Sequence, residues 1–120
     1  MALLTVQDED AFGSNGQPTW TVAEAGGDSF RNDDDNIVVW GMNLNVAPSD
    51  VSLIFNSAQL SSFGDYPDKT LLVPGEYIKI TPSFDGRRFN DSAGIVSWTY
   101  TGLYAGLRVA AVRRQRWFRD

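Results

Sequence analysis

The chain of 120 residues suits one domain, and its 42% hydrophobic and 21% charged residues are typical of a globular protein. It contains no cysteine and no histidine, which excludes disulfide bridges, thiolate zinc sites and His-dependent catalytic triads. The net charge of −5 argues against nucleic-acid binding, and no apolar run approaches the roughly 20 residues of a membrane helix.

Residues 1–17 are predicted to form an N-terminal arm ahead of the first strand. Met1–Val6 is apolar and acids follow within residues 7–10, so no signal peptide is expected. An extended arm can add backbone hydrogen bonds to a neighbouring sheet edge, with Leu3 and Leu4 filling pockets on the partner. The alternative is a disordered, idle terminus.

From residue 18 onward, short β-rich runs alternate with Gly, Pro, Asn and Asp, and helical periodicity is nearly absent. This pattern predicts an all-β domain over residues 18–113, an antiparallel β-sandwich or jelly roll of about 7–8 short strands. The candidate strands are Pro18–Ala23, Asn36–Met42, Asp50–Asn56, Thr70–Val73, Glu76–Thr81, Gly94–Thr101 and Ala105–Arg113.

Alternating apolar residues predict which face of each strand is buried. The sets that share a face are Val51, Leu53 and Phe55; Ile78 and Ile80; Val96, Trp98 and Tyr100; and Leu107, Val109 and Ala111. Trp98 and Tyr100 fill either the core or a partner-facing patch, and the pattern alone does not separate these two interpretations.

Residues 86–94 are predicted to form a corner between two packed sheets. Phe89 is expected to fold inward as a plug. Asn90 and Asp91 are expected to bond nearby backbone amides and so set a sharp turn. Gly94 then permits the reversal into the next strand.

Six short motifs occur in a fixed order: GGDSFRND (26–33), IVVW (37–40), LVPG (72–75), ITPSF (80–84), FNDSAGIVSWTY (89–100) and LRVAAVR (107–113). This series resembles a family of small tailed-bacteriophage head proteins. The resemblance implies a capsid decoration (cement) protein, a non-enzymatic β-sandwich on the outer surface of the virion. It also implies binding to the major capsid protein and a homo-oligomer, most often a trimer. The long N-terminus, the loop of residues 57–69 and the C-terminal extension depart from the family pattern.

The C-terminal extension, residues 114–120, is predicted to be a basic and aromatic docking tail. Residues 8–35 hold eight acids and one base, whereas residues 108–119 hold five arginines and no acid. Arg114, Arg116 and Trp117 are therefore expected to dock on a partner, with acids 33–35 of another copy as the candidate contact. Stacking of the tail on nucleic-acid bases is the alternative, which the sequence pI of about 4.5 disfavours.

Other chemistry receives little support from the sequence. The acidic run 33–35 is contiguous and lacks the mid-loop glycine of a calcium loop, so no metal is expected. Fifteen acids make some close pair of carboxylates inevitable, so such a pair is little evidence for a glycosidase. Neither an enzyme nor a cofactor is expected. The four tryptophans could form a sugar-binding face, so a carbohydrate-binding module is the alternative function. The competing interpretation is that these aromatics fill the core or a subunit contact.

Overall fold

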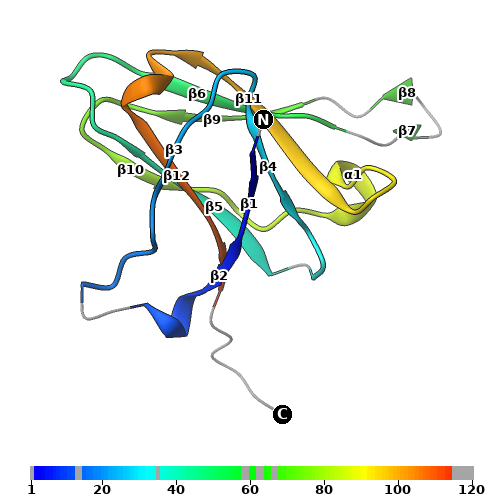
Figure 1. Cartoon of the computed structure of the whole chain (residues 1–120). Helices are drawn as coiled ribbons and strands as arrows, with labels where there is room; N and C mark the ends of the chain where they lie inside the picture. The colour runs from blue at the N-terminus through cyan, green and yellow to red at the C-terminus, as the bar shows by residue number, and fades with distance from the viewer. Residues whose placement is uncertain are drawn as a thin grey trace.

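The structure is a computed structural model that describes residues 2–12, 15–34, 36–57, 60–61, 64–65 and 68–114. Within these residues, two five-stranded sheets pack against each other as a β-sandwich (Figure 1). The predicted all-β sandwich is therefore confirmed.

Both sheets combine segments that are far apart in the sequence. Sheet A has the strand order β1 (Ala2–Leu4), β4 (Asp28–Arg31), β11 (Ile95–Gly102), β6 (Val51–Phe55) and β9 (Lys69–Val73). Sheet B has the order β10 (Ile78–Ile80), β5 (Ile37–Asn43), β12 (Leu107–Arg113) and β2 (Val6–Asp8), and β3 (Thr21–Val22) also pairs with β12. The smaller elements are the ribbon of β7 (Leu60–Ser61) and β8 (Gly64–Asp65), the helical turn α1 (Gly86–Phe89) and the 3-10 turns η1 (Glu9–Ala11) and η2 (Tyr104–Gly106).

The core lies between the two sheets and follows the predicted alternation in three strands. Inward side chains of β6, β11 and β12 are fully buried, and Tyr100 packs against them from a half-buried position. The buried core residues of these strands are Val51, Leu53, Phe55, Val96, Trp98, Leu107, Val109 and Ala111.

The prediction was wrong for β10, where Ile78 and Ile80 are 44% and 49% exposed. Lys79 pairs with Gly41, whose missing side chain would point at core residues. Lys79 therefore shares the inward side of the sheet, and the two isoleucines stand on its outer face. Because β10 is an edge strand, nothing in the described part of sheet B continues beyond it.

The N-terminal residues, predicted to form an arm ahead of the sandwich, pair with strands of the sandwich itself. β1 pairs in parallel with β4, and β2 pairs in parallel with β12, so residues 2–8 add an edge strand to each sheet of their own domain. Leu4 is only 7% exposed and belongs to the core. The backbone pairing that was predicted with a partner's sheet edge thus occurs with the sheets of the same chain.

The corner behaves as expected at Phe89, Asp91 and Gly94. The Asn90 side chain instead exchanges hydrogen bonds with Asn32, which follows β4. Phe89 is buried, and its ring meets Phe84 edge-on at 5.4 Å between centroids. Asp91 Oδ1 accepts hydrogen bonds from the backbone amides of Ala93 (2.8 Å) and Ile95 (3.1 Å). Gly94 has a φ of 78°, which confirms its role in the reversal. The helical turn α1 that carries Phe89 was not predicted.

Candidate docking surface

Four large apolar side chains are exposed at one end of the sandwich, which we call the apolar loop end. They are Leu44 (55% exposed), Val46 (73%), Tyr77 (56%) and Leu103 (62%). They come from the loops that follow β5, β9 and β11, and these loops gather at the end opposite α1 and the β7–β8 ribbon (Figure 1). None belongs to the hydrophobic core, and the isolated fold leaves more than half of each one exposed to solvent.

Hydrogen bonds tie these three loops to one another. The Asn45 side chain donates to the Leu103 carbonyl (2.9 Å), and the Leu44 amide donates to the Gly106 carbonyl (2.8 Å). The amide of Glu76 donates to the carbonyl of Asn43 (2.9 Å), which joins the loop after β9 to the end of β5. The apolar side chains therefore stand on a cross-linked frame.

The Asn43 side chain anchors this frame in the interior. It is 1% exposed and donates to the carbonyls of Ser49 (2.8 Å) and Val73 (3.0 Å). A buried amide with its donors satisfied holds the backbone around it in one arrangement. Exposed apolar groups on such a preorganised frame are typical of an interaction site, because little ordering entropy is lost on binding.

The docking residues predicted from the sequence do not form one surface. Leu3 is 54% exposed on β1, but Leu4 and Trp98 lie in the core and Tyr100 is half-buried beside them. The side chains of Leu4 and Trp98 therefore cannot contact a partner in this fold. Arg114 is exposed at the end of the described chain, and Arg116 and Trp117 lie outside the described residues.

Instead, Trp98 and Tyr100 belong to a buried hydrogen-bond network around Asp28. The Trp98 indole donates to the Tyr100 hydroxyl (2.9 Å), which donates to Asp28 Oδ2 (2.5 Å). The Asp28 carboxylate also accepts from the amides of Ala2 (3.3 Å) and Glu24 (3.2 Å). Burial, and then the bond to Asp28, raises the pKa of Tyr100 above its ordinary value.

This network explains the GGD motif by its role in the fold. Gly27 has a φ of 102°, and a Cβ there would lie 2.0 Å from the Trp98 carbonyl oxygen. Only glycine fits so close to the neighbouring strand, and the next residue, Asp28, then turns its carboxylate into the interior. The motif therefore fixes how β1, β4 and β11 meet.

The acidic run of residues 33–35 also has a partner within the chain. Arg113, at the end of β12, pairs with Asp8 (3.0 Å), Asp33 (2.9 Å) and Asp34 (2.9 Å). Its hydrogen bonds to Asp8 and Asp34 raise the pKa of Arg113 above its ordinary value. Asp35 lies outside the described residues, and the described part of the chain holds no group of three acidic, His or Cys residues placed to bind a metal.

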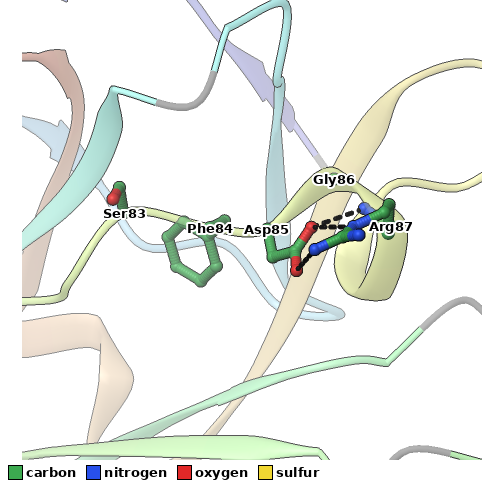
Figure 2. Close-up of a pocket in the computed structure, with 5 residues that line it drawn as sticks. All are labelled: Ser83, Phe84, Asp85, Gly86 and Arg87. Carbon is green, nitrogen blue, oxygen red and sulfur yellow. Dashed lines mark hydrogen bonds and ion pairs between the residues drawn. The ribbon is translucent and has the colours of Figure 1, made fainter.

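An open hollow of about 600 Å³ lies beside α1 and is lined by residues 83–87 (Figure 2). Asp85 caps this helical turn by accepting from the Arg87 amide (2.9 Å), and its carboxylate also pairs with the Arg87 guanidinium (3.3 Å). These bonds from Arg87 lower the pKa of Asp85. The charged groups in the hollow thus complete a helix cap, and no second carboxylate of the described residues lines the hollow, as a glycosidase pair would require.

The described tryptophans are engaged in packing. Trp98 is in the core, and Trp20 packs on Trp40 at 6.2 Å between ring centroids, with Phe12 meeting Trp40 edge-on at 5.6 Å. These contacts occupy part of the aromatic surface that a sugar-binding platform would need. The described residues also contain no helix long and apolar enough to cross a membrane.

No protein-family model, curated protein or solved structure gives a significant match to this chain.

Proposed function

We propose that this protein is a structural virion protein that decorates a bacteriophage capsid and stabilises it by bridging major capsid protein subunits. The observation that carries the proposal is the apolar loop end, where four exposed apolar side chains stand on loops held together by Asn43 and Asn45. The sequence motifs that resemble small phage head proteins supply the identity of the partner.

In this proposal the loop end inserts its apolar side chains into a groove between capsid subunits. An ordinary specific interface buries about 800 Å² on each partner, a scale that one end of a small sandwich can supply. A protein that binds the closed shell but not the opened shell stabilises the closed form by mass action, because opening must also break these contacts. The proposed role needs no catalytic residue, and a trimer would place three loop ends on the shell together.

Co-sedimentation with capsids tests the proposal, using shells assembled from the major capsid protein encoded nearest to this protein's gene. The double variant Val46→Ser/Leu103→Ser should keep its fold, because both side chains are exposed, and should lose capsid binding. Leu3→Ser is the matched control, because Leu3 is equally apolar and 54% exposed but lies on β1.

Three outcomes would contradict the proposal. The wild-type chain would fail to sediment with the shells, or the double variant would bind as well as wild type. In the third outcome, a glycan array would give a signal in the absence of any capsid binding, which would favour the carbohydrate-binding alternative.

A further inference from the structure

The outer face of sheet B carries an apolar stretch, only one part of which is covered. Val38, Ala110 and Val112 form a second small core on this face. The chain's own N-terminal segment covers it, because Phe12 and Trp20 pack there together with Trp40. Beyond Trp40, the neighbouring Ile78 and Ile80 are exposed and carry no such cover among the described residues.

A hollow of about 320 Å³ marks the boundary between the covered and uncovered parts. Its lining combines apolar side chains of sheet B with the charged Glu9 and Arg114. The lining residues are Glu9, Val38, Trp40, Ile80, Thr81 and Arg114. A hollow of this size and lining suits one large aromatic side chain that is flanked by a charged group.

The described chain ends at this hollow. The Arg114 amide donates to the Asn36 carbonyl (2.9 Å), and the Asn36 side chain donates back to the Arg114 carbonyl (2.7 Å). These bonds fix the point from which residues 115–120 depart. An extended chain spans about 3.3–3.6 Å per residue, so Trp117 is within reach of a hollow that Arg114 itself lines.

We propose that this hollow receives the side chain of Trp117 from the same chain. The chemistry is complementary, because Trp117 matches the apolar wall and Arg116 matches the acids of η1, Glu9 and Asp10. Attachment through Arg114 makes the binding intramolecular, which gives a high effective concentration. The tail then covers one part of the apolar outer face of sheet B, as Phe12 and Trp20 cover the other part.

The absence of cysteine from the chain allows a direct test that does not involve capsids. A nitroxide spin label attached at Asp120→Cys would be observed through the backbone amides of a ¹⁵N-labelled chain by NMR. The doubly labelled chain is diluted with unlabelled wild-type chain, so that only contacts within one molecule are seen. We expect signal loss at Trp40, Ile80 and Thr81, and none at Val46 or Leu103 on the apolar loop end.

A second sample separates the chain's own tail from the tail of another copy. It mixes a ¹⁵N chain without the spin label with a spin-labelled chain that carries no ¹⁵N. Signal loss at Trp40 and Ile80 in this sample alone would overturn the proposal, because the tail would then bind a neighbouring copy. Equal signals with and without the label in both samples would also overturn it. Trp117→Ala in the doubly labelled chain should restore the signals, and their continued loss would show that Trp117 is not the group bound.

Discussion

Phe89 illustrates how a single side chain holds the corner between the sheets. It is 5% exposed and lies edge-on to Phe84, which in turn packs on Phe30 and Phe55. Truncation would leave a cavity at the end of this aromatic row, where the rigid turn around Asp91 limits collapse. We expect Phe89→Ala to lower the free energy of unfolding by about 3–5 kcal/mol in urea denaturation. An unchanged unfolding midpoint would contradict the buried position of Phe89.

A second residue-scale prediction concerns the Tyr100 hydroxyl. Tyr100→Phe leaves the buried indole N–H of Trp98 without its acceptor and Asp28 without one donor. We expect a loss of about 1–3 kcal/mol at neutral pH, the cost of a buried polar group left unsatisfied.

The same residue should make the wild type sensitive to alkali. The folded-state pKa of Tyr100 is raised, mainly by burial, above the ordinary value of 10.0. As the pH rises above that value, the unfolded chain releases this proton while the folded chain retains it, so stability is lost. Urea unfolding between neutral and strongly alkaline pH should therefore show a steeper loss for wild type than for Tyr100→Phe. Parallel pH profiles for the two proteins would contradict the role of this hydroxyl.

At the scale of elements, Arg113 joins the end of β12 to β2 and to the acidic loop before β5. The three carboxylates approach one guanidinium from different segments, and the Arg113 side chain is 32% exposed. An exposed ion pair contributes at most about 1 kcal/mol to the free energy of unfolding, so this network stabilises the N-terminal edge strand only modestly.

We therefore expect Arg113→Gln to lower the melting temperature at low salt. The difference from wild type should shrink with added salt, because exposed charges are screened over about 10 Å at 0.1 M. Arg87→Gln is the matched control, since the Arg87 side chain is 93% exposed and its pair with Asp85 is local. An Arg113→Gln effect that does not vary with salt would show that packing, rather than charge, explains the loss.

The seven predicted strands all exist, although β3 is only two residues long. The missed strands are β1, β2, β4, β7 and β8, each two to four residues long. The register of β1, β2 and β4 depends on partners distant in the sequence. β4 also carries the buried polar pair Asp28 and Ser29, which alternation of apolar residues cannot identify. Local pattern thus predicts every strand of five or more residues, whereas it misses most of the shorter ones.

The apolar loop end was missed for a related reason. Leu44, Val46 and Leu103 stand beside turn residues, where sequence reasoning expects polar side chains and assigns no face. Their proximity results from Asn43 and Asn45, whose side-chain bonds join three loops that no local pattern connects. An apolar residue on each side of an asparagine in a predicted loop, as in Leu44-Asn45-Val46, was the signal available.

At the scale of the whole molecule, the N-terminal segment fastens the two sheets together. It contributes β1 to sheet A, β2 to sheet B, Leu4 to the core and Phe12 to the outer face of sheet B. The Ala2 amide also bonds Asp28 in the buried network. A segment with contacts on both sheets and on an outer face acts as part of the domain, whatever its role toward partners.

Deleting residues 1–17 should therefore destabilise the isolated sandwich. The loss should exceed that of Leu4→Ala alone, for which we expect about 2–5 kcal/mol as for other truncated core leucines. Deleting residues 115–120 is the control, because every strand remains, and it should lower the melting temperature much less. Thermal unfolding followed by near-ultraviolet circular dichroism would compare the three chains, since Trp98 reports on core packing. If the chain lacking residues 1–17 melts like the full chain, residues 2–8 do not hold the sheets together and are free to pair with a neighbour's sheet edge.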